Sequence, residues 1–172
     1  LCETGLKNIQ PAQHTIALTF VAGYLNNVLN VVPLLKKYRV PATFFVSSVC
    51  LKEKNYIHPS DYLDLINFFI KEKAEINEKI FRKGKYHLSG PDGETSSVYQ
   101  YINSLSLASI HETFSDLKIR YPRKDITQRV NEEAFRLIEG HELRTLLTED
   151  LITIGSHGHL HINMETLSND EV

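Results

Sequence analysis

The chain has 172 residues and a formal net charge of −2 at pH 7. This length fits one domain with a sizeable core, and a nearly neutral chain has no electrostatic reason to bind nucleic acid or an anionic membrane. No apolar run approaches the roughly 18 residues of a membrane span. Residues 1–10 (LCETGLKNIQ) also lack the apolar stretch of a signal peptide, which leaves the localisation open.

Cys2 and Cys50 are the only cysteines, and they lie far apart in the sequence. Two such residues form neither a CxxC metal site nor a disulfide framework. We therefore expect two unpaired thiols, with Cys50 partly buried, and a weak preference for a reducing compartment.

The first part of the chain predicts a strand, a helix and a second strand. Residues 15–20 (TIALTF) are apolar and β-branched, as in a buried strand, and residues 42–46 (ATFFV) have the same character. Between them, residues 26–38 (NNVLNVVPLLKKY) have apolar positions at helical spacing and two lysines near the end. Pro33 predicts a kink or a new start within this helix. A βαβ unit of this length predicts a parallel sheet with a right-handed crossover.

Residues 51–140 have a different pattern, which predicts a largely helical insertion in the α/β scaffold. We expect helices at about 61–81, 98–117 and 126–138, where apolar residues recur at helical spacing. A turn-rich break at 89–93 (SGPDG) separates the first two. A structureless loop of this length would be unusual in a compact domain.

After the insertion the chain returns to the α/β pattern. Residues 142–147 (ELRTLL) predict a short helix, and residues 151–154 (LITI) predict a third buried strand. The predicted strands are apolar throughout, which is typical of a parallel sheet covered by helices on both faces.

Three histidines, His157, His159 and His161, follow the third strand at alternate positions within GSHGHLHINM. In parallel α/β proteins, sites form at the carboxyl ends of the strands, and imidazole is the commonest metal ligand. In a helical turn His157 and His161 would share a face, whereas in an extended segment all three would. The pattern indicates a metal site, and a polar loop without a metal is the alternative.

Two segments of the chain together resemble the polysaccharide deacetylases of the NodB-homology type, carbohydrate esterase family 4. The stretch TIALTFVAGYLNN…VVPLLKKYRVPATFFV resembles the opening of that domain, and ELRTLLTEDLITIGSHGHLHINMETLS resembles its second motif region. The family motifs in these regions are T-F-D-D-G and H-[ST]-x-x-H. The resemblance covers roughly residues 15–48 and 140–172 and leaves the insertion at 51–140 uncovered.

The resemblance implies a fold and a chemistry. The expected fold class is α/β, a partial distorted (β/α) barrel of the NodB type with a largely helical insertion, in a single domain over residues 1–172. The implied reaction is hydrolysis of the N-acetyl amide of an amino sugar or glycan, with a divalent metal, zinc by preference, held by one aspartate and two histidines. A metal-bound water attacks the carbonyl, a carboxylate takes its proton, and a histidine protonates the leaving amine.

The second motif is retained in this chain. By the resemblance, His157 and His161 match the two metal-ligand histidines, whereas His159 lies between them at a position that is not a ligand. Ser156 and Asn163 would shape the loop or orient the ligands.

The first motif lacks both of its aspartates. Val21 stands at the general-base position and Ala22 at the third-ligand position, and neither residue can accept a proton or bind a metal. The loss of a general base alone costs about 10²–10⁴-fold in rate. Tyr24, just beyond this motif, would line the substrate pocket. The motif residues that do match are Thr19, Phe20 and Gly23.

The family's later motifs, which supply an arginine, an aspartate and the catalytic histidine, are not found before Val172. We therefore expect a domain that is incomplete at its C-terminal end, with a partner chain or an oligomer covering the open sheet. Ionisable residues elsewhere could substitute for the missing groups, although each is more typical of a solvated surface: His14, Asp61, Asp92, Glu94, His111, Asp116 and His141.

Three functions follow from these observations. The first is a metal-dependent deacetylase of an N-acetylated sugar, impaired in this chain. The alternative is a catalytically inactive deacetylase-like domain that binds a glycan or a protein partner. The third is a helical interaction module formed by residues 51–140. The sequence contains no phosphate loop, nucleotide fingerprint or nucleophile elbow.

Overall fold

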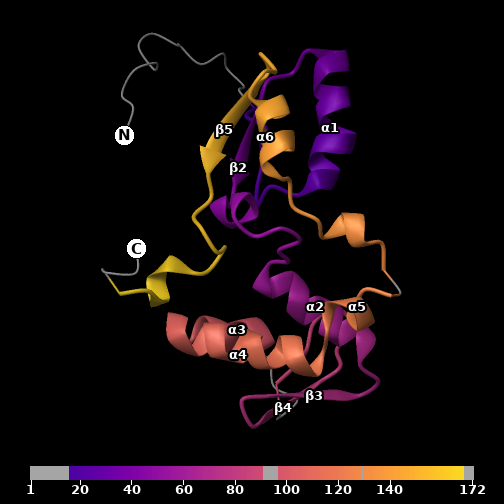
Figure 1. Cartoon of the computed structure of the whole chain (residues 1–172), viewed down its shortest axis with the longest axis vertical. Helices are drawn as coiled ribbons and strands as arrows, with labels where there is room; N and C mark the ends of the chain where they lie inside the picture. Colours follow the sequence, from indigo (N-terminus) through magenta and orange to yellow (C-terminus); the bar gives the residue numbers. More distant parts are fainter. Residues whose placement is uncertain (1–15, 91–96, 129, 169–172) are drawn as a thin grey trace.

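The computed structural model describes residues 16–90, 97–128 and 130–168 (Figure 1). Its sheet has three parallel strands, β1 (Thr19–Phe20), β2 (Ala42–Val46) and β5 (Ile152–Ser156), in the order β1-β2-β5. The central strand β2 places Phe44 opposite both Phe20 and Ile154. The predicted parallel sheet is confirmed, and the fold is mixed α/β. The first strand is shorter than predicted, and Thr15 lies outside the described residues.

Two helices pack with the sheet. The predicted helix at 26–38 is α1 (Leu25–Tyr38), which runs through Pro33 and ends where Arg39 adopts a left-handed conformation. The predicted helix at 142–147 is α6 (Gly140–Leu146). Figure 1 shows both helices beside β2 and β5, at the same end of the molecule.

The predicted helix at 61–81 is wrong in its second half. Helix α2 (Pro59–Phe69) ends early, and the chain then forms an antiparallel hairpin of β3 (Lys73–Ile76) and β4 (Lys79–Arg82). The connecting residues Asn77 and Glu78 both have positive φ, as the tight turns of hairpins require. Exposed and buried residues alternate along β3, which is the strand period that the helical prediction overlooked.

The rest of the 51–140 region also differs from expectation. The predicted helix at 98–117 is divided into α3 (Val98–Asn103) and α4 (Leu107–Arg120), because Ser106 caps the start of α4 with its side chain. The predicted helix at 126–138 is wrong. Only α5 (Arg123–Ile126) and the short 3₁₀ turn η2 (Glu132–Ala134) form there, and the chain then bridges back to Tyr24 through Leu137. The region is therefore not wholly helical.

Buried apolar side chains form two clusters. The first, the sheet core, joins α1, β2 and α6 around Phe44. The second, the helical core, joins α2, the β3–β4 hairpin, α3 and α4 around Ile66. The chain passes directly between them, because Tyr56 packs against the sheet core whereas Ile57 belongs to the helical core. In Figure 1 the two groups of elements occupy opposite ends of the longest axis.

Within the described residues, no helix combines the length and the apolar character that crossing a bilayer requires.

Candidate functional site

The histidine segment, residues 157–161, begins where β5 ends. The amide of His157 donates a hydrogen bond to the carbonyl of Val46, with 3.0 Å between nitrogen and oxygen. The amide of Ser48 in the turn after β2 donates to the carbonyl of Gly158, also over 3.0 Å. The segment therefore lies at the carboxyl end of the parallel sheet, where the sequence predicts a site.

Two of the three histidines come together and one does not. The rings of His157 and His161 have centroids 4.9 Å apart. His161 has a positive φ of 56°, which turns its side chain out of the alternating pattern of an extended segment. His159 is exposed, and its Nδ1 lies 2.9 Å from the hydroxyl of Ser48. The pair that the family motif assigns to the metal is the pair that meets.

A third imidazole, that of His58, lies against the pair. Its ring centroid is 4.4 Å from that of His161. His58 is fully buried, at 0% exposure, and neither of its ring nitrogens has a hydrogen-bond partner among the described residues. Burial, followed by the neighbouring His161, lowers its pKa to about 4, so the ring is neutral near pH 7. We call His58, His157 and His161 the histidine cluster.

The sequence did not single out His58, because an isolated histidine has no motif or spacing to mark it. It directly precedes Pro59, the first residue of α2, in an extended conformation that proline favours in the residue before it. Only the contact between the start of α2 and the histidine segment reveals its place in the cluster.

The first motif reaches the same cluster. Val21 is 49% exposed, whereas Ala22 is 1% exposed and has a positive φ of 69°. The backbone of Ala22 acts on the His58 ring and opposes the lowering of its pKa, although no hydrogen bond of good geometry joins them. The position of the missing third ligand therefore adjoins His58.

Tyr24 and Asp61 form a half-buried pair next to His58. The hydroxyl of Tyr24 donates to Asp61 Oδ2 over 2.7 Å, and the Tyr24 ring meets the His58 ring edge-on with centroids 5.8 Å apart. Burial raises the pKa of Asp61 to about 6, against the opposing effect of the Tyr24 hydrogen bond. Burial, followed by the charge of Asp61, raises the pKa of Tyr24. Asp61 is thus the rescue candidate that lies near the cluster.

The other rescue candidates lie elsewhere. Asp116 forms an ion pair with Arg120 on α4, the helix that also carries the exposed His111. His141 begins α6 and faces Glu139 and Glu142. His14, Asp92 and Glu94 lie outside the described residues.

A cavity of about 850 Å³ adjoins the histidine segment. This volume is within the range of sites that bind small molecules. Its described lining does not include Tyr24, whose hydroxyl is engaged by Asp61, so a pocket role for Tyr24 stays a prediction. The wall is contributed by α2, α3, α4 and residues 156–167, including Ser60, Leu63, Tyr99, Ile102, His157, His161 and Met164.

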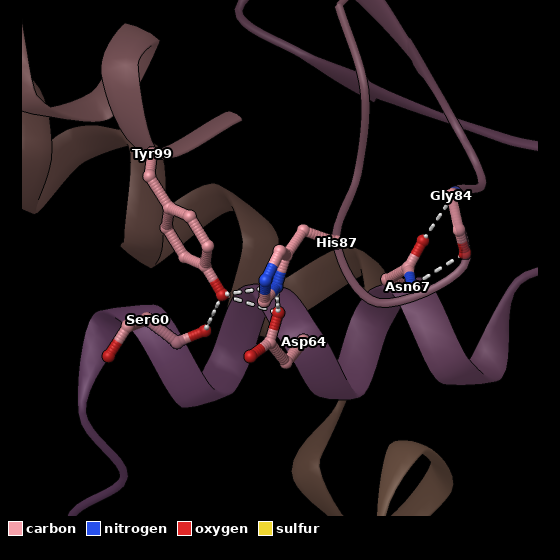
Figure 2. A network of polar contacts seen from close by, with 6 residues as sticks. All are labelled: Ser60, Asp64, Asn67, Gly84, His87 and Tyr99. Atoms are coloured by element: carbon pink, nitrogen blue, oxygen red, sulfur yellow. Dashed lines mark hydrogen bonds and ion pairs between the residues drawn. The ribbon is translucent and has the colours of Figure 1, made fainter. Parts of the chain in front are cut away.

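One wall of the cavity is fixed by a polar network (Figure 2). The hydroxyl of Tyr99 donates to Asp64 on α2, and His87 Nδ1 lies 2.8 Å from the same carboxylate. One helical turn further, Asn67 and Gly84 exchange two hydrogen bonds, of 3.0 Å and 3.2 Å. These contacts attach α3 and the end of the hairpin to α2, which holds the Tyr99 ring in the cavity wall.

The donor set of the cluster suits a nitrogen-ligated divalent metal in kind. Three imidazoles meet, and one of them, His58, is buried with neither ring nitrogen hydrogen-bonded in the described structure. As the side chains stand, no group of three or more histidine, cysteine or carboxylate residues in the described ranges is arranged around a common point for a metal ion. The His58 and His161 rings and the His161 and His157 rings are nevertheless neighbours, with centroids 4.4 Å and 4.9 Å apart.

A family model for polysaccharide deacetylases matches residues 8–172. The chain therefore belongs to the polysaccharide deacetylase family. The match runs through residues 51–140, which the motif resemblance left uncovered. In the same comparisons, no curated protein and no solved structure gave a significant match.

Proposed function

We propose that this chain is a deacetylase-like domain that binds an N-acetylated amino sugar or glycan in the cavity beside the histidine segment. In this proposal His157 and His161 hold a divalent metal, zinc by preference, and hydrolysis of the acetamide is impaired. The observation that carries the proposal is the meeting of these two rings, 4.9 Å apart, in the cavity wall of a family member.

The residues around the cavity have different roles in this proposed function. When bound, the metal supplies Lewis-acid activation of a water and of the amide carbonyl. His157 and His161 would present ring nitrogens to it, and the half-buried Tyr99, whose hydroxyl donates to Asp64, offers its ring to the sugar. Val21 cannot take a proton from the water, which removes about 10²–10⁴-fold in rate. Asp61 does not replace it, because its carboxylate is engaged by Tyr24 behind His58.

The sheet supports a second part of the proposal. Within the described ranges, β1 and β5 each pair on one side only. Unpaired strand edges are stabilised when another strand or a covering element satisfies their backbone groups. We propose that the three strands belong to a distorted (β/α) barrel whose open edges are covered by further strands, a second copy or a partner chain.

The experiment separates binding from turnover. The purified chain is titrated with zinc in a calorimeter and then assayed on chito-oligosaccharides with zinc or cobalt. We expect binding of the metal, binding of N-acetylated oligomers, and no measurable release of acetate. Fully deacetylated oligomers of the same length are the matched control and should bind more weakly. Robust turnover would show that the deacetylase is active and that the impairment is wrong.

A catalytically inactive binding domain is the second candidate. The replacement of both motif aspartates by Val21 and Ala22 favours it. Under this candidate, oligosaccharide binding is independent of zinc. Under the first candidate, removal of the metal with a chelator weakens binding of the N-acetylated oligomer, because the acetamide carbonyl loses its electrophilic partner.

A further inference from the structure

The structure points to His58 as the third metal ligand of this chain. We infer that it takes the place of the aspartate missing at Ala22, so that the metal site consists of three imidazoles, those of His58, His157 and His161. This inference rests on the proposed function and changes the ligand set that the family motif implies.

The position of His58 is the first argument. Its ring lies 4.4 Å from that of His161, and His161 lies 4.9 Å from His157, so the three rings form one contiguous group. On its other side His58 adjoins the backbone of Ala22, where the motif has its metal-binding carboxylate. The side chain of His58, directly before α2, therefore lies next to position 22, where the motif's carboxylate is missing.

The orphaned nitrogens of His58 are the second argument. A buried polar group without a partner carries a free-energy cost, and nearly all such groups in folded proteins are satisfied. His58 is fully buried, and both of its ring nitrogens lack a hydrogen bond in the described structure. A histidine kept only for packing would be expected to bond through at least one nitrogen. Coordination to a metal would satisfy one of these buried nitrogens.

The surroundings of the ring are the third argument. Tyr24 and Tyr56 both meet His58 edge-on, with centroids 5.8 Å and 5.6 Å away and interplanar angles of 83°. Their hydroxyls are directed to other partners, Asp61 and the carbonyl of Leu160. The two rings flank the imidazole, and the polar groups that act on it are the other two histidines and the backbone of Ala22. The ring is therefore held beside the cluster before any metal binds.

The backbone fixes the same position. His58 caps the start of α2 with φ −57° and ψ 146°, and Pro59 restricts the residue before it to this extended region. Helix α2 is anchored in the helical core through Leu63 and Ile66. A side chain on such a rigid support can serve as a metal ligand with little ordering cost.

The test uses the whole chain, stripped of metal by a chelator, and a matched set of phenylalanine variants. Phenylalanine retains an aromatic ring and removes both nitrogens. Zinc is titrated calorimetrically into the wild type, His58→Phe, His157→Phe and His159→Phe. We expect one zinc per chain in the wild type, affinity lower by about tenfold or more in the first two variants, and wild-type affinity in His159→Phe. Cobalt absorption in the visible region should weaken in the same two variants.

The stability of the metal-free variants tests whether zinc binding is lost because the variant is unfolded. Because His58→Phe removes two unsatisfied buried atoms, its metal-free form should unfold at a urea concentration no lower than that of the wild type. Loss of zinc binding by a folded variant then identifies a ligand. If His58→Phe does not fold, His58→Gln, which keeps polar atoms but not the imidazole, is measured in its place.

The outcomes distinguish this inference from the proposed function. If His157→Phe loses zinc while His58→Phe retains wild-type affinity and an unchanged cobalt spectrum, His58 is not a ligand and only the inference is overturned. If the wild type binds no zinc, or if His157→Phe binds it unchanged, the proposed metal site itself is wrong and the inference falls with it.

Discussion

The rings of His58 and His161 lie in contact, with centroids 4.4 Å apart, although the two residues are separated by about a hundred positions in the chain. His58 directly precedes α2, whose buried face belongs to the helical core, whereas His161 follows β5 of the parallel sheet. The contact therefore joins the two halves of the molecule at the edge of its cavity. It also brings a nitrogen donor to the place where the first motif has lost an oxygen donor.

An aspartate restored at position 22 should be able to replace His58 as the third metal ligand. In the His58→Phe background, Ala22→Asp should recover zinc affinity by about tenfold or more, because a carboxylate again adjoins the histidine pair. The positive φ of Ala22 favours this change, since aspartate adopts that region more readily than alanine does. Titration calorimetry of the double variant measures the recovery.

In the wild-type background the same Ala22→Asp change should tighten zinc binding less than it does in His58→Phe, because His58 already serves as the third ligand. Val21→Asp, at a half-exposed position, provides the control for added charge. Equal gains in both backgrounds would mean that His58 and position 22 act independently. No gain in either background would mean that the motif is misaligned or that the site is not assembled.

Asp61 should make the stability of the fold depend on pH. Burial raises its pKa above the ordinary value of an aspartate to about 6, so the folded state favours the protonated form. The contribution of protonated Asp61 to the free energy of unfolding is fully present below the pKa that Asp61 has in the unfolded chain. It is lost as the pH rises through about 6. The stability of the wild type relative to Asp61→Asn should therefore fall between pH 4 and pH 7, by at most about 3 kcal/mol.

Urea unfolding of both proteins at each pH measures this difference. All other ionisable groups are common to the two proteins, so the comparison isolates residue 61. Asp116→Asn, at the exposed carboxylate paired with Arg120, is the control and should give a nearly parallel curve. If the curve of unfolding free energy against pH for Asp61→Asn also runs parallel to that of the wild type, Asp61 is not desolvated.

Gly155 should be intolerant of a side chain. It pairs with Phe45 across β2 and β5, and a Cβ atom there would lie 2.6 Å from the Phe45 ring. Gly155→Ala should cost about 1–3 kcal/mol in the free energy of unfolding, because the ring or the strand must move. Gly140→Ala is the matched control, since the nearest neighbour of its Cβ atom would be the Arg144 side chain at 3.7 Å.

Phe45→Leu in the Gly155→Ala background should recover part of that loss, because it removes the ring that the new methyl group meets. Chemical denaturation of the single and double variants gives the coupling between the two positions. If Gly155→Ala is as stable as Gly140→Ala, the predicted close packing of β2 on β5 at this pair is incorrect.

Asn67 should matter more than His87 in the network of Figure 2. Asn67 is 4% exposed, and its amide satisfies both backbone groups of Gly84. Asn67→Ala should cost about 1–3 kcal/mol because it leaves these groups unpaired. His87→Ala should cost less than about 1 kcal/mol, since the His87–Asp64 contact is half exposed. Thermal or urea unfolding ranks the two, and the reverse order would contradict the assignment.

The parallel sheet could be predicted from the sequence because its strands are apolar and each is followed by a turn. The β3–β4 hairpin could not, because its strands have only four residues each and its turn is Asn77-Glu78 rather than a common Asn-Gly pair. In so short a segment, Ile76 fits a helical stripe with Phe69, seven residues earlier, as well as it fits an alternating strand. The pattern was decided by packing in the helical core.

The candidate site likewise has residues that could be predicted from the sequence and residues that could not. His157 and His161 could be predicted because they are close in sequence and match a motif. His58 could not, because its relation to them exists only after α2 packs beside the histidine segment. Asp61 could be named but not distinguished from Asp116, since burial and the hydrogen bond from Tyr24 are tertiary properties.

The separation of the buried side chains into a sheet core and a helical core has a mechanical consequence. The two clusters share no member among the described residues, and the histidine cluster draws its members from both sides. A metal bound there would cross-link the two parts of the molecule, which could otherwise unfold one after the other. Calorimetric melting of the stripped chain should then broaden or split into two transitions, whereas the zinc-loaded chain should melt in a single, sharper one.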